Sequence, residues 1–199
     1  MTDEKEITLD RRRVVARILR ERGDALLVTG LGSTTWDAAA AGDHDHNFYV
    51  WGAMGGATLL GLGLALAQPQ RRVLVVTGDG EMLMGLGGLA TIAVQQPRNL
   101  SVIVIDNESY AETGMQATHT RHGVDLAGMG AAAGFAQSIT VLKDSELERS
   151  LPIIYQSAGP VLVVIKVTTT AAPTVLPPRD GTYIKNRFRQ AVLGNEVFK

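Results

Sequence analysis

The chain has 199 residues, about the size of one domain, since a domain takes roughly 100–200 residues. Apolar residues make up 45% of it, which is enough for a sizeable core and excludes disorder of the whole chain. The net charge of −1 disfavours a nucleic-acid partner, and the lack of cysteine excludes disulfides, Cys-ligated zinc and iron–sulfur clusters.

The first residues, MTDEKEITLD, are polar and acidic, whereas a signal peptide begins with basic and then apolar residues. We therefore expect a cytoplasmic protein. The longest apolar run, at residues 57–67, is interrupted by glycine and is too short for a membrane span, which needs about 20 apolar residues. We expect no contact with a membrane.

The pattern of apolar residues predicts helices and strands that alternate along the chain. Charged residues with apolar ones at helical spacing predict an amphipathic helix at 10–22. The further expected elements are strand 25–29, helices 33–41 and 55–67, strand 73–77, helix 85–95, strand 101–106, helix 126–133, strand 139–142, helix 145–156 and strand 161–167. A proline-rich stretch follows, and then a basic helix near 185–193.

Continuous apolar strands separated by helices predict an α/β fold, in which a mostly parallel sheet has helices on both faces. Ligands of such folds bind at the carboxyl ends of the strands. We expect residues 1–170 to form this domain and residues 171–199 to form a proline-rich arm and a C-terminal docking tail.

The most informative segment for function runs from strand 73–77 into Gly78-Asp79-Gly80. It continues through the next strand to Asp106-Asn107. Neighbouring parallel strands end at the same edge of a sheet, so we expect Asp79 and Asn107 to lie close together. Carboxylate and amide oxygens suit Mg²⁺, which takes further oxygens from substrate phosphates. The alternative is a tight turn without a ligand, but the strand contexts and the second oxygen favour the metal.

Gly78-Asp79-Gly80, 26 further residues and Asn107 resemble the binding motif of the thiamine diphosphate enzymes. The resemblance implies thiamine diphosphate and Mg²⁺ as cofactors, with the metal held by the side chains of Asp79 and Asn107 and the main-chain oxygen of Ser109. It departs from the family at Asp106, where many members have a second asparagine. Around this motif it implies that Gly78, Asp79, Gly80, Glu81, Asn107 and Tyr110 bind the cofactor.

A second candidate segment, Trp51 to Ala57, contains three glycines and leads into an apolar helix. Small residues let the backbone approach a ligand, and helix N-termini bind phosphate. The alternatives are a core methionine at Met54 and glycines needed only for packing. The segment is similar to one that precedes the metal motif in decarboxylases of this family. That similarity implies cofactor binding by Gly52, Ala53, Met54 and Gly55, with the Gly52 carbonyl on the aminopyrimidine and Met54 between the two rings.

A polar stretch at 108–120 follows the strand that carries Asn107, and functional residues concentrate in such loops. Glu112 and His119 are its candidate catalytic residues, and His122 is a further titratable group. The alternative is a solvated surface loop.

This stretch and the tail Lys185-Asn186-Arg187-Phe188 resemble the β subunits of sulfopyruvate decarboxylase and the matching half of phosphonopyruvate decarboxylase. The resemblance implies a carboxy-lyase that converts a small anionic 2-oxo acid into an aldehyde and CO₂. In such decarboxylases an upstream domain supplies the glutamate that activates the cofactor. The 50 residues before Trp51 are too few for that domain, so the resemblance implies a separate α subunit with the pyrimidine-binding domain, in a hetero-oligomer. The alternatives are the β subunit of a 2-oxoacid oxidoreductase and a non-catalytic cofactor-binding module.

Overall fold

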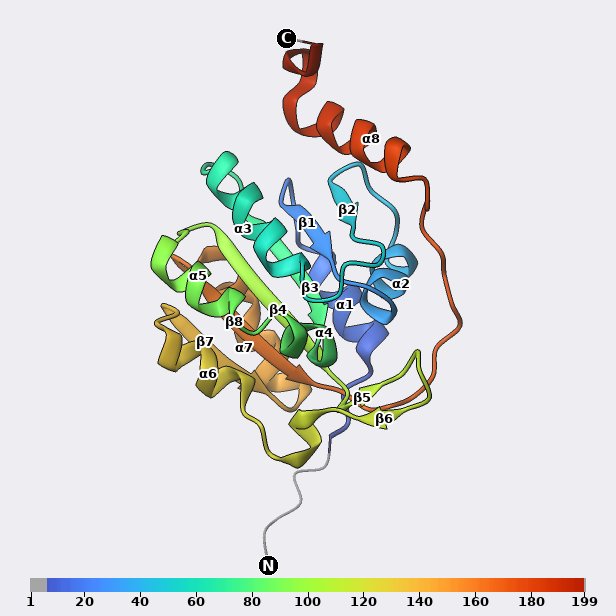
Figure 1. Ribbon diagram of the computed structural model, residues 1–199, viewed down its shortest axis with the longest axis vertical. Helices are drawn as coiled ribbons and strands as arrows, with labels where there is room; N and C mark the ends of the chain where they lie inside the picture. Colours follow the sequence, from blue (N-terminus) through green and yellow to red (C-terminus); the bar gives the residue numbers. More distant parts are fainter. Residues whose placement is uncertain (1–6, 199) are drawn as a thin grey trace, which may run out of the picture.

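The computed structural model describes residues 7–198, so most of the segment used above to argue against an export signal lies outside the described residues. A six-stranded, fully parallel sheet forms its centre (Figure 1). The strands, in their order across the sheet, are β2 (Asn47–Tyr49), β1 (Leu26–Thr29), β3 (Val73–Gly78), β4 (Leu100–Asp106), β8 (Val161–Lys166) and β7 (Gln137–Val141). The predicted α/β fold with a mostly parallel sheet is confirmed.

In the described part of the chain, eight α-helices surround this sheet, and a small antiparallel hairpin lies at its carboxyl edge. The helices are α1 (Arg11–Leu19), α2 (Ser33–Ala40), α3 (Ala57–Ala67), α4 (Asp79–Met84), α5 (Gly88–Gln95), α6 (Leu126–Ala133), α7 (Asp144–Gln156) and α8 (Gly181–Leu193). The hairpin consists of β5 (Ser109–Tyr110) and β6 (Gln116–Ala117), and two 3₁₀ helices are η1 (His119–His122) and η2 (Gly194–Phe198). None of the helices within residues 7–198 is long and apolar enough to cross a membrane.

The core lies in two layers because successive side chains of a strand point to opposite faces. On one face, Leu74 and Val76 of β3 belong to the cluster that contains residues of α1, α2 and α7. On the other face, Val73 and Val75 belong to the cluster with residues of α3, α5 and α6. Both faces of the sheet are therefore covered, as the apolar runs of the strands require.

The structure corrects three predictions about local elements. Strand β2 was missed because its three residues follow a charged, histidine-containing turn and are too few to give an alternating pattern. The hairpin of β5 and β6 was interpreted only as a polar loop, because its two-residue strands carry no apolar signal. Gly78-Asp79-Gly80 is not a turn before a helix at 85–95: Gly78 ends β3 in an extended conformation, and α4 begins directly at Asp79.

The C-terminal tail runs along the molecule to α8, which packs beside β2 and is followed by η2 (Figure 1). Ile184 and Phe188 of α8 are buried, and the Phe188 ring meets the edge of Phe48 with 5.4 Å between centroids. Arg187 forms an ion pair with Asp43, with 2.6 Å between Nη1 and Oδ2. Because α8 covers the edge strand of the same chain, its docking onto another subunit stays a prediction.

The packing of α3 on β3 yields a prediction. A Cβ atom at Gly61 would lie 2.2 Å from Cγ2 of Val75, whereas a Cβ atom at Gly63 would meet no atom of another element or side chain within 4 Å. We expect Gly61→Ala to lower the free energy of unfolding by about 1–3 kcal/mol through overpacking. Gly63→Ala, on the same helix, should raise it by about 0.5–1 kcal/mol. Denaturant unfolding tests the pair, and equal stabilities of the two variants would contradict this packing.

Candidate functional site

A cavity of about 490 Å³ lies at the carboxyl edge of the sheet, beside the ends of β1, β3 and β4. The segments that line it are the start of α1, the loop after β1 with the start of α2, the loop before α3, the junction of β3 and α4, and the end of β4 with the segment that follows it. The lining residues are Arg11, Leu31, Ser33, Thr34, Met54, Gly78, Asp79, Gly80, Glu81, Met84, Ile105, Asn107, Ser109, Tyr110, Ala111, Glu112 and Thr113.

The predicted metal ligands meet in this cavity because their strands are neighbours. Gly78 of β3 pairs with Ile105 of β4, so Asp79 and Asn107 both follow the same edge of the sheet. Asp79 is 2% exposed, and Ser109 is buried in β5. The Asn107 side-chain oxygen accepts a hydrogen bond of 3.1 Å from the Ser109 backbone N–H, which fixes the turn between the two residues. A carboxylate, an amide oxygen and a main-chain carbonyl form the hard oxygen set that suits Mg²⁺.

Two threonines and a second aspartate surround the Asp79 carboxylate. Its Oδ2 accepts hydrogen bonds from Thr118 at 2.5 Å and from Thr120 at 3.3 Å. Burial, and then the charge of Asp106, raise the pKa of Asp79 to about 6. The ionised form of Asp79 is therefore costly in the protein alone, and a cation bound beside it would offset that cost.

Asp106, the residue that departs from the family motif, is compensated by a lysine on the neighbouring strand. Lys166 of β8 lies opposite Asp106 in the register and places its Nζ 2.8 Å from Oδ2 of Asp106 and 2.7 Å from Oε1 of Glu108. Burial of Lys166 opposes its charge, but the hydrogen bonds to these carboxylates outweigh burial and raise its pKa. The positive charge of Lys166 therefore balances the extra carboxylate, that of Asp106. Sequence reasoning missed Lys166 because only the pairing of β4 with β8 brings it there.

Of Gly52, Ala53, Met54 and Gly55, only Met54 lines the cavity. Its side chain is 39% exposed, so it is not the core methionine of the alternative interpretation. Gly55, with φ of 87°, lies against the backbone of Gly85 at the end of α4, where a Cβ atom would come within 2.8 Å of the Gly85 nitrogen. That close contact fixes the loop that carries Met54. Gly52 and Ala53 are exposed beside it.

Glu81 and Tyr110 support the cavity wall. Glu81 is buried and accepts hydrogen bonds from the Thr77 hydroxyl at 2.8 Å and from the Leu31 N–H at 3.1 Å. Burial raises the pKa of Glu81. The Tyr110 ring lies 2.4 Å from the position of a Cβ atom at Gly80, so only glycine fits at Gly80. Glu81 thus ties the loop after β1 to α4, and Tyr110 holds the hairpin against the same helix.

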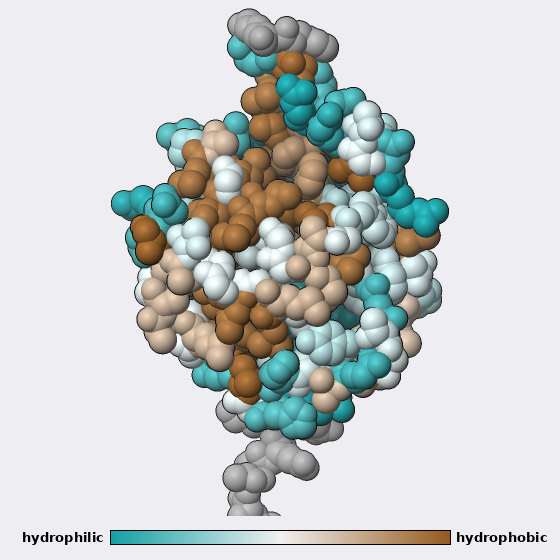
Figure 2. All heavy atoms as spheres, in the orientation of Figure 1, coloured by the Kyte–Doolittle hydropathy of each residue, from teal (hydrophilic) through white to brown (hydrophobic). Residues whose placement is uncertain are grey.

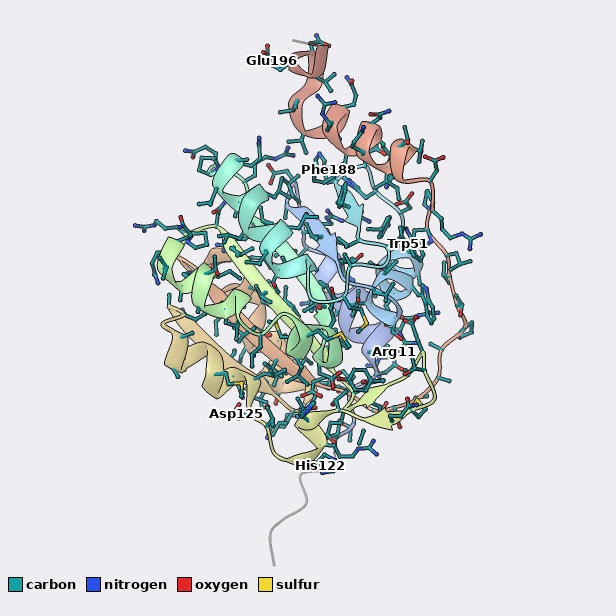
Figure 3. All side chains as sticks on the ribbon, viewed as in Figure 1. Arg11, Trp51, His122, Asp125, Phe188 and Glu196 are labelled. Carbon is teal, nitrogen blue, oxygen red and sulfur yellow. The ribbon has the colours of Figure 1, made fainter. Side chains whose placement is uncertain are left out.

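The structure brings one of the two predicted catalytic residues to the cavity. Glu112 lines it from the tip of the β5–β6 hairpin. His119 is exposed in η1 and is not part of the lining, and neither is His122, which lies at the outer edge of the chain (Figure 3). The stretch at 108–120 is thus partly a cavity wall and partly the solvated loop of the alternative interpretation.

Sequence reasoning also missed the wall formed by the N-terminal third of the chain. These lining residues come from α1, from the loop after β1 and from the start of α2, and they are Arg11, Leu31, Ser33 and Thr34. Arg11 is one of several arginines on a charged helix, so nothing in its pattern separates it from the solvent-facing ones. The position of the loop after β1 depends on the pairing of β1 with β3, which the sequence does not specify.

The charge balance around the metal ligands can be tested through Lys166. We expect Lys166→Met to lower the free energy of unfolding by about 1–3 kcal/mol, because it leaves the buried carboxylate of Asp106 without its cation. Lys143→Met is the matched control, because Lys143 is exposed and its nitrogen lies 3.8 Å from Glu146; we expect a change below about 1 kcal/mol. Denaturant unfolding measures both. Equal effects of the two substitutions would contradict the role of Lys166.

The architecture matches solved structures of larger enzymes. It superposes on benzoylformate decarboxylase from Polynucleobacter necessarius with a TM-score of 0.71 and 18% identity over 87% of this chain. For the 4-hydroxybenzoylformate decarboxylase of Rhodococcus jostii the TM-score is 0.66 and the identity 17%, over 84% of this chain. The chain spans 36% and 34% of the lengths of these two proteins, and at these identities the likeness concerns the fold.

Relatives found by sequence share a higher identity with this chain than these solved structures do. The chain is 37% identical to sulfopyruvate decarboxylase subunit beta of Methanothermobacter thermautotrophicus, over 94% of this chain and 97% of the relative. It is 38% identical to phosphonopyruvate decarboxylase of Streptomyces viridochromogenes, over 72% of this chain but only 36% of that protein. Residues 30–165 match the family model described as thiamine pyrophosphate enzyme, C-terminal TPP binding domain. The chain therefore belongs to the thiamine pyrophosphate enzymes, as a member that carries their TPP-binding domain.

Proposed function

We propose that this chain is the β-type subunit of a thiamine diphosphate- and Mg²⁺-dependent decarboxylase of a small anionic 2-oxo acid. The observation that carries the proposal is the meeting of Asp79, Asn107 and Ser109 in one cavity that Met54 also lines. The proposal is supported by the relatives named sulfopyruvate decarboxylase subunit beta, of which this chain covers 95–98%. Phosphonopyruvate decarboxylases, matched over part of their length, support the same class of substrate.

The residues at the cavity fit this cofactor. The side chains of Asp79 and Asn107 and the main-chain oxygen of Ser109 would hold Mg²⁺, and the metal would in turn hold the diphosphate. Met54 would support the thiazolium and aminopyrimidine rings from the loop that Gly55 fixes. When bound, the cofactor supplies the electron sink that allows a 2-oxo acid to lose CO₂ and leave as an aldehyde.

The chain's own residues would also shape the reaction space. Leu31, Met54 and Met84 give the cavity apolar walls, which exclude water and strengthen electrostatic interactions inside it. Glu112 is the carboxyl side chain of the hairpin that lines this space, and burial raises its pKa, although the Ser33 backbone and Arg11 oppose that rise. A carboxyl group with a raised pKa is suited to exchange a proton with a reacting oxygen. Because His119 lies outside the lining, it takes no part in this proposal.

We propose that a separate α subunit completes the active site. Residues 7–50 form α1, β1, α2 and β2. Strands β1 and β2 belong to the six-stranded sheet whose carboxyl edge carries the cavity, so these residues form no second domain. Figure 2 shows apolar residues gathered over α3, where Leu59, Leu60 and Leu66 are exposed. An apolar surface of this kind is typical of a protein interface. These observations support a hetero-oligomer in which the partner brings the pyrimidine-binding domain and the activating glutamate.

The metal site can be tested with Asp79→Asn, which removes the charge and keeps the shape of the side chain. We expect the affinity for thiamine diphosphate in the presence of Mg²⁺ to fall at least about tenfold, because the one charged group among the three proposed metal ligands becomes neutral. Asp24→Asn is the control, since Asp24 is exposed, precedes β1 at the opposite edge of the sheet and is not part of the cavity lining. Calorimetric titration of the chain with its partner measures both. Unchanged affinity in Asp79→Asn would refute this metal site.

The need for a partner makes a second prediction. We expect the chain mixed with its α subunit to decarboxylate sulfopyruvate or phosphonopyruvate, and each subunit alone to have less than about 1% of that rate, because each holds only part of the cofactor site. Release of CO₂ and formation of the aldehyde are the readouts. A mixture that binds cofactor tightly but decarboxylates neither acid would contradict the proposed activity and favour a non-catalytic module.

A further inference from the structure

Arg11 is a buried cation in the cavity wall that the proposed metal and cofactor contacts leave unused. It is the first residue of α1, only 7% of it is exposed, and it lines the cavity. Its Nη1 atom donates to Oδ2 of Asp37 at 2.5 Å and to the Ser33 carbonyl at 3.2 Å. Both bonds use the same nitrogen. The remaining N–H groups of the guanidinium are therefore available for a ligand, and a guanidinium binds oxyanions through a planar pair of donors.

The charge of Arg11 is only partly neutralised by its neighbours, so an anion could bind beside it. Arg11 and Arg12 share one carboxylate, because the Arg12 Nε lies 3.0 Å from Oδ1 of Asp37. Asp37 is fully buried and neutralises only one of the two guanidinium groups. Arg12 faces away from the cavity and donates to the Pro173 carbonyl at 2.6 Å. The uncompensated positive charge on the cavity side therefore lies at Arg11.

In this structure a carboxylate of the chain itself faces that charge. Glu112 extends from the β5–β6 hairpin to the loop before α2, where its Oε1 lies 1.4 Å from the position of a Cβ atom at Gly32. Burial raises the pKa of Glu112, while the Ser33 backbone and the charge of Arg11 lower it. Gly32, with φ of 81°, makes room for this approach, and α2 has no side-chain cap of its own. The Glu112 carboxyl group thus lies at the start of α2, in the cavity that Arg11 also lines.

We infer that Arg11 and the Ser33 backbone form an oxyanion-binding site in the cavity, that Glu112 fills this site in the free chain, and that a phosphate- or sulfonate-type group displaces Glu112. This inference rests on the proposed function. Two ligands carry such a group: the diphosphate of the cofactor and the acidic substituent of the substrate. In both cases displacement of Glu112 frees its carboxyl group for the reaction space and lets the hairpin move with ligand binding.

Titration calorimetry with two unreactive probes tests this site and separates its two sources. Inorganic pyrophosphate with Mg²⁺ represents the diphosphate, and 3-sulfopropanoate represents the acidic three-carbon substrate. The variants are Arg11→Gln, Arg12→Gln as the matched control that shares Asp37, and Glu112→Gln, each in the full chain with its partner.

We expect Arg11→Gln to weaken at least one probe about 10–100-fold, as the loss of a charge-assisted hydrogen bond predicts, and Arg12→Gln to weaken it less than about threefold. Glu112→Gln should tighten the same probe by about threefold or more, because the competing charge is gone. Loss of pyrophosphate binding assigns the site to the cofactor, and loss of sulfopropanoate binding assigns it to the substrate.

Equal effects of Arg11→Gln and Arg12→Gln would overturn the inference, since Arg11 would then act only as a partner of Asp37. No tightening in Glu112→Gln would overturn the part that concerns Glu112. If Arg11→Gln fails to fold, Arg11→Lys keeps a charge beside Asp37 but loses the planar donors, and it should still weaken the probe. A wild-type pair that binds thiamine diphosphate but neither probe overturns this inference alone, whereas one that binds no cofactor overturns the proposed function as well.

Discussion

The site depends on the parallel pairing of β3 with β4, which brings two segments 26 residues apart to one edge of the sheet. Gly78 stands opposite Ile105, so the residues that follow each strand, Asp79 and Asn107, reach the same cavity. The central strands β1, β3, β4 and β8 are buried on both faces, and their apolar side chains hold this register against slippage. The polar ligands need no packing of their own, because the core sets the positions of the strand ends.

The balance of charge around these ligands is the second constraint. Asp79, Asp106 and Glu108 lie close together, and Lys166 and two threonine hydroxyls stabilise them. Carboxylates held this close oppose one another's ionisation, which a divalent cation would relieve. A site that is costly without its metal and favourable with it links the binding of the cation to the order of the cavity wall. Arg11 and Glu112 line the same cavity, and there a buried cation lowers the pKa of a carboxyl group on the exposed hairpin.

The sequence was sufficient to predict the sheet, its central strands and the approach of Asp79 to Asn107, because these follow from apolar runs and from the edge rule for parallel strands. It was not sufficient for Lys166 or Arg11. Lys166 reaches Asp106 only because β8 is the neighbour of β4, and strand order is a long-range property. For His119 the sequence predicted a catalytic residue that the structure does not place in the cavity lining, because nearness to Ser109 in the sequence does not ensure nearness in the fold. Short elements such as β2 were not predicted, because three residues are too few to show a periodic pattern.

The central claim is that the oxygens of Asp79, Asn107 and Ser109 hold the metal of a thiamine diphosphate cofactor at the carboxyl edge of the sheet. A crystal structure of the chain with its partner, thiamine diphosphate and Mg²⁺ tests it most directly. The account predicts a metal ion about 2.0–2.1 Å from one side-chain oxygen each of Asp79 and Asn107 and from the Ser109 carbonyl, with the diphosphate on its open side. A cofactor bound elsewhere, or a metal that lacks Asp79 as a ligand, would contradict it.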